Sequence, residues 1–278
     1  MIDGNTTLIA HIGYPTFGFK APLIYNPHFA AVGINAVVMP MGCQAAHYPA
    51  LLRAVFQLTN IGGALITMPH KVSTVALLDE ASVPVKIAGA CNAVKRDAAG
   101  RLIGDLFDGE GFVRALKTKG FSLTSAAALV VGAGGVGCAI AAALAAAGVQ
   151  RLVLTDTNLA STHALAARIH QHYPALDVSV GSNDPAGFDL VVNATPLGMQ
   201  EGDALPVDVA RMAPHALAGE VVMRIEITPF LAAARARGCA VQTGTEMLFE
   251  QIPAYLEFFG FPATTAAQLR SLARLPAV

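Results

Sequence analysis

Short apolar runs alternate with longer segments of mixed polarity along the first third of the chain. The apolar runs predict strands, and the longer segments carry apolar positions at the spacing of one helix face. The predicted strands span residues 7–13, 36–41 and 63–68, and the predicted helices span residues 22–32, 48–57 and 71–78. Two shorter strands, 90–96 and 102–105, flank a turn at residues 97–100. Strands joined by crossover helices favour a mostly parallel sheet that helices cover on both faces.

The same alternation resumes near residue 107 and predicts a second α/β unit. Strands are expected at residues 127–131, 151–155, 177–180, 188–193 and 220–225. Helices are expected at residues 110–117, 135–147 and 159–172, and the tail from residue 246 to residue 277 is expected to be helical. The pattern therefore predicts two α/β domains, residues 1–106 and residues 107–240.

A glycine-rich loop joins the strand 127–131 to the helix 135–147. Its residues are Gly132, Ala133, Gly134, Gly135, Val136 and Gly137. In a strand–loop–helix setting, the pattern G-x-G-x-x-G is typical of dinucleotide binding. The first glycine permits a tight turn, the second lets the backbone approach the pyrophosphate, and the third lets helix and strand pack closely. The alternative is a glycine-rich turn that binds nothing.

The strand 151–155 is followed by an acidic residue, Asp156, about 20 residues after the last glycine of the loop. A carboxylate at this distance accepts hydrogen bonds from the ribose hydroxyls of NAD and repels the 2′-phosphate of NADP. The residues that follow, TNLAST, contain no arginine. We therefore expect NAD to be favoured over NADP. The alternative role for Asp156 is the N-cap of the next helix.

Another loop of small residues, NATPLGM, follows the strand 188–193. Asn193, Thr195 and Gly198 would lie at the strand end that faces the cofactor, and they are candidate contacts to its ribose or nicotinamide. A plain turn is the alternative.

The composition argues against several other classes of protein. Mean hydropathy is high, +0.53, but glycine or polar residues interrupt each long apolar stretch, so we expect no membrane span. A net charge of −1 offers no basic surface for nucleic acid. The four cysteines and eight histidines form no metal-binding pattern, so we expect reduced thiols and no metal. The N-terminal sequence has no secretory signal pattern, which predicts a cytoplasmic protein.

Residues 66–71, ITMPHK, place Lys71 at the carboxyl end of a predicted strand. On its own, such a lysine is most simply a solvated residue. Together with GACNAV, GDLFDG, GAGGVG, NATPLGM and GTEMLFEQ, in this order along nearly the whole chain, the segment resembles the shikimate dehydrogenase family. The resemblance implies a substrate domain, a Rossmann domain for NAD or NADP, and C-terminal helices that return to the first domain, so that residues 241–278 join residues 1–106. It also implies an enzyme of aromatic amino acid biosynthesis that oxidises the ring hydroxyl of shikimate, or runs the reverse reaction.

The resemblance also assigns roles to individual residues. Lys71 and Asp108 match the catalytic pair, and Thr67, Asn92 and Gln251 match substrate-binding positions. Hydride transfer at a ring carbon requires a proton to leave or reach the attached oxygen, which a lysine can relay while it stabilises the developing alkoxide. The aspartate would hold the lysine and set its pKa. The alternatives are a loop N-cap for Asp108, a turn residue for Asn92 and an exposed helix face for Gln251.

The segment that binds the substrate carboxylate in this family is altered in this chain. The family presents two serines in G-x-P-x-x-x-S-x-S-P, whereas residues 13–22 are GYPTFGFKAP, with Phe19 and Ala21 at the serine positions. Leu65 stands where the family has an asparagine, two residues before the threonine of this motif. An aromatic ring and a methyl group donate no hydrogen bonds, so a carboxylate there should bind weakly unless Lys20 reaches inward.

Three functions therefore remain open. The first is an NAD-dependent dehydrogenase of this family, monomeric or homodimeric, that acts on another cyclic alcohol or hydroxy acid. The second is a shikimate or quinate dehydrogenase with a rebuilt carboxylate site. The third is a nucleotide-binding regulator without catalysis, which would gain little from retaining a lysine–aspartate pair.

Overall fold

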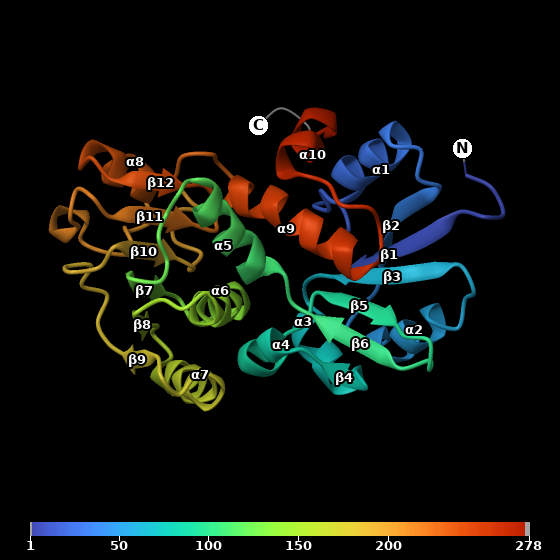
Figure 1. Ribbon diagram of the computed structural model, residues 1–278, viewed down its shortest axis with the longest axis horizontal. Helices are drawn as coiled ribbons and strands as arrows, with labels where there is room; N and C mark the ends of the chain where they lie inside the picture. The colour runs from blue at the N-terminus through green and yellow to red at the C-terminus, as the bar shows by residue number, and fades with distance from the viewer. Residues whose placement is uncertain (1, 276–278) are drawn as a thin grey trace. The chain divides into compact units, whose positions relative to one another are not determined.

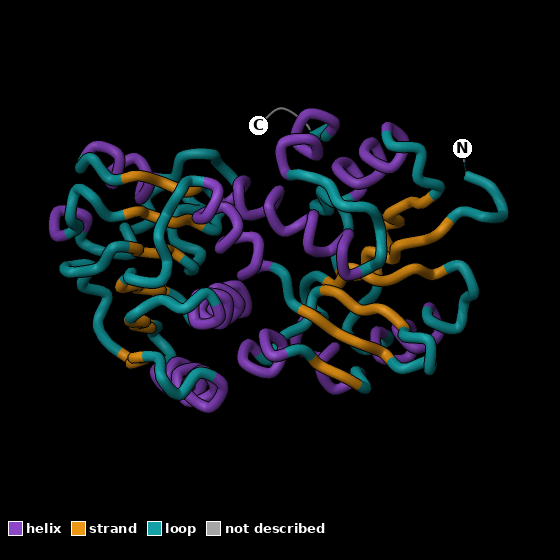
Figure 2. The backbone as a smooth tube through the Cα atoms, viewed as in Figure 1, coloured by secondary structure: helices purple, strands orange, loops and turns teal. Residues whose placement is uncertain are grey.

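The computed structural model describes residues 2–275 and divides into two compact α/β units (Figure 1). One unit contains the residues up to Phe107 and those from Ile252 onward, and the other is Asp108–Gln251. The second crossing between the units falls within the helix α9 (Gly244–Phe258). Each unit has its own sheet, as the strands in Figure 2 show.

The first unit is built on a six-stranded sheet in the order β2-β1-β3-β5-β6-β4. Its strands are β1 (Thr7–Gly13), β2 (Ala36–Gly42), β3 (Ile61–Ile66), β4 (Glu80–Ala81), β5 (Ala93–Arg96) and β6 (Leu102–Asp105). β1 pairs in parallel with β2 and β3, whereas β5 runs antiparallel to β3 and β6. The carboxyl ends of β1, β2 and β3 therefore share one edge of the sheet, where the site described below is built.

The helices of the first unit are α1 (Pro22–Ala31), α2 (Tyr48–Val55), α3 (Lys71–Thr74), η1 (Val75–Leu77), α4 (Val83–Ala88) and α10 (Ala266–Leu272). The C-terminal segment returns to this unit: α10 packs against α1, and Arg274 N donates to the Leu23 carbonyl at 2.8 Å. The expected return of the C-terminal helices is therefore confirmed.

The second unit carries an all-parallel sheet in the order β12-β11-β10-β7-β8-β9. Its strands are β7 (Ala127–Val131), β8 (Arg151–Thr155), β9 (Asp177–Val180), β10 (Leu190–Asn193), β11 (Leu217–Glu220) and β12 (Ala240–Gln242). Its helices are α5 (Asp108–Thr118), α6 (Gly135–Ala146), α7 (Leu159–His172), η2 (Val209–Arg211) and α8 (Pro229–Ala236). Counted from β7, this is the 3-2-1-4-5-6 order of a Rossmann fold, with the change of direction between β7 and β10. The predicted fold class is confirmed.

Several predicted bounds differ from the structure by one to three residues, and three differences are larger or change the assignment of a segment. The strand expected at residues 220–225 lies at Leu217–Glu220, because the Glu220 carboxylate accepts the N–H groups of Val221 and Val222 and ends the ladder there. Residues 241–251 belong to the second unit, where β12 pairs with β11 and Glu246 binds Lys119 at 2.6 Å. The C-terminal tail is two helices, α9 and α10, separated by residues 259–265; residues 276–277 of the predicted helix lie outside the described residues.

Candidate active site

Lys71 lies at the carboxyl edge of the first sheet, as the first residue of α3. β3 ends at Ile66, and Thr67 stays beside β1 because its backbone N–H donates to the Ile12 carbonyl at 3.0 Å. The Lys71 side chain is partly buried, and its own carbonyl accepts a hydrogen bond from Cys91 N at 2.9 Å. The backbone that carries the lysine is therefore held from two sides.

The preceding residue, His70, is fully buried and anchors this turn. Its ring stacks on Tyr48 with centroids 4.0 Å apart, and its Nε2 lies 2.8 Å from the Cys43 carbonyl. Burial lowers the pKa of His70, so the ring is neutral and Nε2 donates to that carbonyl. The Tyr48 hydroxyl in turn lies 2.6 Å from Thr74 Oγ1 in α3. Sequence reasoning missed this anchor, because its partners come from segments distant in the chain.

Asn92 is buried beside the same edge and has one unused polar group. Its Oδ1 accepts the backbone N–H of Phe107 at 3.0 Å, which ties Asn92 to the residue before Asp108. Its Nδ2 is buried without a hydrogen-bond partner among the described residues. Buried amides are normally satisfied, so this NH₂ group is available to a ligand.

The altered carboxylate segment packs onto the end of β1. A Cβ atom at Gly13 would lie 2.4 Å from Thr67 Cγ2 and 2.9 Å from Phe19 Cζ, so these two side chains meet over the glycine. Ala21 is the N-cap of α1 and provides no side-chain hydrogen bond. Lys20 is partly buried and forms no ion pair within residues 2–275. The aromatic ring therefore occupies the surface next to Thr67.

Asp108 and Gln251 are positioned in the second unit by glycines of α5. A Cβ at Gly109 would lie 2.0 Å from the Ala139 carbonyl oxygen of α6, and one at Gly111 would lie 2.8 Å from Gln251 N of α9. α5 therefore packs tightly on both helices, with Gln251 against its first turns. Asp108 is buried as the first residue of α5, and Gln251 Oε1 is buried without a hydrogen-bond partner in the described chain.

The glycine-rich loop contains two kinds of glycine. Gly132 has φ +108°, and a Cβ there would lie 2.7 Å from backbone atoms of Ala194. A Cβ at Gly137 would lie 2.0 Å from the Gly132 carbonyl oxygen. The packing of the protein itself thus requires glycine at these two positions. A Cβ at Gly134 or Gly135 would meet nothing within 4 Å, which leaves open space on the ligand side of the loop.

The amino terminus of α6 is open to an anion. Its N-cap, Gly134, provides no side-chain hydrogen bond, and its first turn contains no acidic residue. The loop also sits at the change of strand direction between β7 and β10, where dinucleotides bind in this fold. The residues present fit the pyrophosphate of NAD or NADP.

Asp156 lies at the end of β8 and contacts this loop. Its Oδ2 accepts Ala133 N at 2.6 Å, and its Oδ1 accepts Asn158 N at 2.8 Å and Thr157 Oγ1 at 3.2 Å. Partial burial raises the pKa of Asp156, but these hydrogen bonds outweigh it and hold the pKa below its usual range. The carboxylate is therefore ionised near neutral pH. The N-cap of α7 is Asn158, not Asp156.

Asn193 is engaged inside the protein. Its Nδ2 donates to both carboxylate oxygens of Glu220, at 3.0 and 3.1 Å, and to the Leu197 carbonyl at 2.9 Å. Its Oδ1 accepts the Thr195 hydroxyl at 2.6 Å. Thr228 Oγ1 completes the network by donating to Glu220 at 2.8 Å. Asn193, Glu220 and Thr228 are fully buried, so they shape the loop from beneath.

The other two predicted residues of this loop share that organisation. Thr195 Oγ1 accepts Leu197 N at 3.1 Å, and Gly198, with φ +96°, donates its N–H to Asp203 at 2.9 Å. Glu220 is a functional candidate that sequence reasoning missed. The only sequence signal for Glu220 was an acidic residue at the start of a predicted apolar strand.

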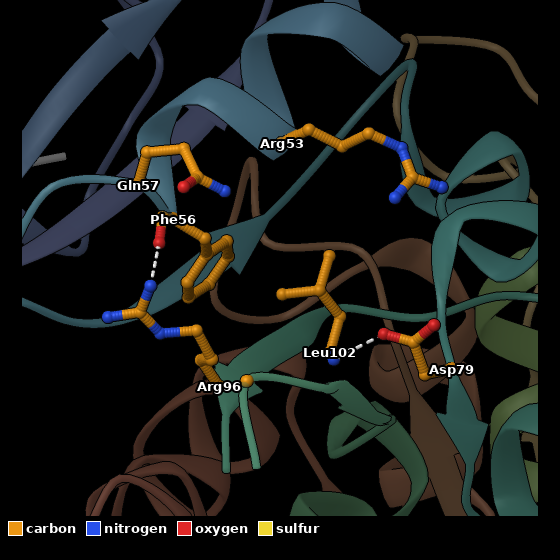
Figure 3. A pocket seen from close by; sticks show the side chains of 7 residues that line it. Arg53, Phe56, Gln57, Asp79, Arg96 and Leu102 are labelled. Atoms are coloured by element: carbon orange, nitrogen blue, oxygen red, sulfur yellow. Dashed lines mark hydrogen bonds between the residues drawn. The ribbon is translucent and has the colours of Figure 1, made fainter. Parts of the chain in front are cut away.

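A hollow elsewhere in the first unit contains none of the predicted residues (Figure 3). It has a volume of about 300 Å³ and is lined by Arg53, Phe56, Gln57, Asp79, Arg96, Gly100 and Leu102. Because β5 runs antiparallel to β3, Arg96 lies near the amino end of β3, at the edge opposite Lys71. Its polar groups are partly used: Arg96 donates to the Phe56 carbonyl, and Asp79 accepts Leu102 N at 2.7 Å.

The described residues contain no group of three or more side chains arranged to hold a metal ion. None of the helices within residues 2–275 is both long and apolar enough to cross a membrane.

Comparisons with known proteins agree with this geometry. A family model for the shikimate dehydrogenase substrate binding domain matches residues 12–94, and one for the ThiF family matches residues 115–171, which include the glycine-rich loop. The shikimate dehydrogenase (NADP(+)) of Rubrobacter xylanophilus is 34% identical over 98% of this chain and 97% of its own length.

Solved structures show the same relationship. Quinate dehydrogenase from Corynebacterium glutamicum in complex with NAD is 31% identical, with a TM-score of 0.84 over 96% of this chain and 98% of that one. Shikimate 5-dehydrogenase from Listeria monocytogenes in complex with shikimate and NAD shares the fold, with a TM-score of 0.91 over 98% of this chain and 97% of that one, at 24% identity. The chain therefore belongs to the shikimate dehydrogenase family of NAD(P)-dependent oxidoreductases.

Proposed function

We propose that the protein transfers a hydride between NAD and a cyclic secondary alcohol or its ketone, related to shikimate but bound through a rebuilt carboxylate end. The observation that carries this proposal is the edge of the first sheet. There Lys71, Thr67 and the unused Nδ2 of Asn92 are retained, while Phe19 occupies the surface beside Thr67. Side chains suited to a ring hydroxyl thus lie at the same sheet edge as the apolar Phe19 ring.

The reaction requires the chain to move one proton at the substrate oxygen. Bound nicotinamide supplies or accepts the hydride. In the reduction, the Lys71 ammonium gives a proton to the carbonyl oxygen as negative charge develops there; in the oxidation, Lys71 receives the hydroxyl proton. By analogy with the family's catalytic pair, the Asp108 carboxylate would favour the charged form of the lysine, and solvent would replace the proton that Lys71 gives up. Asn92 Nδ2 donates to a ring hydroxyl and orients the substrate.

The preference for NAD rests on Asp156. Its ionised carboxylate lies against the phosphate-binding loop, bonded to Ala133 N at 2.6 Å. A 2′-phosphate near this carboxylate would meet like charge, whereas ribose hydroxyls would donate to it. The 31%-identical quinate dehydrogenase in complex with NAD supports the same preference, and the relatives named for NADP(+) point the other way. Replacing Asp156 by serine should therefore narrow the difference between the Kd values for NAD and NADP.

Shikimate or quinate oxidation is a second candidate. The similarity to quinate dehydrogenase favours it, and Lys20, which has no ion pair in the described chain, offers a cation for a carboxylate. The two candidates differ in the KM for shikimate or quinate. A rebuilt carboxylate site predicts a low KM for these acids, and an apolar surface at Phe19 predicts a high one.

The test is absorbance at the reduced nicotinamide band with shikimate or quinate, each with NAD and with NADP. Wild type is compared with Lys71→Met, Asp108→Asn and the double variant. Turnover that falls at least 100-fold in each single variant, with the double variant no worse than the poorer single one, supports two residues acting as a unit. Losses that multiply would refute the joint role. NAD binding by wild type without turnover of either acid or their neutral analogues would favour a binding protein.

A further inference from the structure

His11 is a polar residue in the last part of β1 that the proposed reaction leaves without a role. β1 is an interior strand, and His11 pairs with Pro40 on β2 and with Leu65 on β3. Only 8% of its surface is exposed. Residues two apart on a strand share a face, so His11 lies on the same side as Gly13.

The surroundings of His11 are the residues of the candidate substrate site. Its ring stacks on Phe19 with centroids 4.0 Å apart and planes at 29°. The far end of the same Phe19 ring lies over Gly13, next to the Thr67 side chain. Lys71 is close enough to act on His11 electrostatically. The imidazole therefore contacts Phe19 and lies within electrostatic reach of Lys71, two of the predicted site residues.

The imidazole is neutral and unsatisfied. Burial, assisted by the positive charge of Lys71, lowers the pKa of His11 to about 4. Its Nδ1 is completely buried, and no described residue hydrogen-bonds to it. Asn92 Nδ2, a group that the resemblance assigns to the substrate, is in the same condition. Buried polar atoms without partners are uncommon in folded proteins, so each of these two groups is a candidate contact to a ligand.

The position of His11 matches a polar group that this chain has lost. Leu65, its direct neighbour on β3, stands where the family has an asparagine. Adjacent residues in a parallel ladder project from the same face. His11 thus returns hydrogen-bonding capacity to this face, one strand away.

We propose that His11 is a substrate-binding residue that selects an uncharged hydroxyl or carbonyl group at the end of the pocket where relatives hold a carboxylate. The proposal rests on the proposed function. A neutral imidazole offers one donor and one acceptor, which suits a hydroxyl. A carboxylate only accepts, and His11 would offer it a single donor beside the Phe19 ring, where the two serines are missing. The substrate class is therefore a polyhydroxylated ring without a charge at this end.

The experiment compares shikimate with its neutral carboxamide on the full-length protein. His11→Leu removes the polar atoms and keeps an apolar side chain on Phe19, whereas His11→Asn restores a donor and an acceptor. We expect wild type to have a lower KM for the carboxamide than for shikimate. His11→Leu should raise the carboxamide KM about tenfold, with kcat within threefold and the KM for shikimate unchanged, and His11→Asn should recover part of the loss.

Calorimetric titration of the carboxamide, with NAD present, separates the two proposals because it needs no turnover. Binding that His11→Leu weakens tenfold, in a protein without turnover, supports the role of His11 and defeats the proposed function. Lys71-dependent turnover with a carboxamide KM that His11→Leu does not change overturns the role of His11 alone. Equal effects of His11→Leu on both compounds would mean a packing role only, and absence of binding would also overturn the inference. Melting curves of each variant establish that it is folded.

Discussion

The two kinds of glycine in the loop GAGGVG lead to a pair of substitutions with opposite expected effects. Gly134→Ala adds a methyl group where no protein atom lies within 4 Å, at an extended backbone with φ −75° and ψ −175° that any residue adopts. Gly137→Ala adds one at 2.0 Å from the Gly132 carbonyl oxygen. The first should therefore affect the ligand, and the second should affect the fold.

The magnitudes follow from these contacts. At Gly134, alanine is a poorer N-cap than glycine by several tenths of a kcal/mol, and the stiffer unfolded chain returns about 0.4–1 kcal/mol, so stability stays within about 0.5 kcal/mol. The methyl group holds the pyrophosphate away from the backbone. Losing a hydrogen bond to a charged group costs about 1.5–3 kcal/mol, which is roughly a 10- to 100-fold increase in Kd. At Gly137, overpacking against a fixed turn costs about 1–3 kcal/mol or more of unfolding free energy.

The assay is thermal melting of each full-length variant without ligand, followed by titration with NAD. Gly4→Ala is the matched control, because Gly4 also has open space around its missing Cβ but lies far from the loop in the chain. We expect Gly134→Ala to melt with wild type and to bind NAD weakly. Gly137→Ala should melt about 5 °C lower or more. Wild-type NAD affinity in Gly134→Ala would refute the assignment of the pyrophosphate to this loop.

Three further predictions test other parts of the molecule. Burial raises the pKa of Glu220 although Val222 N, Asn193, Thr228 and Val221 N all donate to it, so the folded protein loses stability from this group as pH rises above about 4.5. The unfolding free energy of wild type minus that of Glu220→Gln should therefore fall from pH 4.5 to pH 7. A rise of this quantity over the same range would contradict the reasoning. The pKa of His11, about 4 against 6.5 when unfolded, implies that wild type loses roughly 3 kcal/mol between pH 6.5 and pH 4 that His11→Leu keeps. Denaturant unfolding at both pH values measures this, and parallel losses would count against a neutral imidazole. The double substitution Phe19→Ser and Ala21→Ser should lower the KM for shikimate about tenfold, because charge-assisted hydrogen bonds are worth about 1.5–3 kcal/mol. Steady-state kinetics with the neutral carboxamide as control should show no such gain, and an equal gain with both compounds would exclude carboxylate recognition.

Periodicity located the elements of the second unit well up to β9, because each apolar run there ends at glycine or at a polar cluster. The bounds of β7, β8, α7 and β9 coincide with the predicted ones. β11 was misplaced because its sequence, LAGE, is weakly strand-like and the next residues, VVMRI, are more apolar. Its small residues are needed by packing: a Cβ at Gly219 would lie 2.5 Å from Phe112 of α5, a partner more than 100 residues away. No local pattern carries that information.

In the candidate site, too, features set by local sequence were predicted and features set by distant partners were not. Motif spacing singled out the loop glycines and Lys71 as candidates, since these motifs depend on short-range order in the chain, and their roles stay predictions. It missed His70, Glu220 and the setting of His11, which depend on partners from other segments. Sequence reasoning also treated Asn193 as a ligand contact, whereas its side chain is used inside the protein.

Asn92 and Asn193 show how the structure separates two roles that the sequence presents alike. Both are buried asparagines next to strand ends, in loops of small residues. Asn193 uses its Nδ2 and its Oδ1, so its hydrogen bonding is complete without a ligand. Asn92 uses its Oδ1 for Phe107 N and leaves Nδ2 unpaired in the described chain. An unpaired buried donor lowers stability by about 1–3 kcal/mol, and a ligand that accepts its hydrogen bond would remove this cost. By this criterion Asn92 and His11 stay predicted substrate contacts, whereas Asn193 and Glu220 support the loop at residues 193–198 from inside the protein.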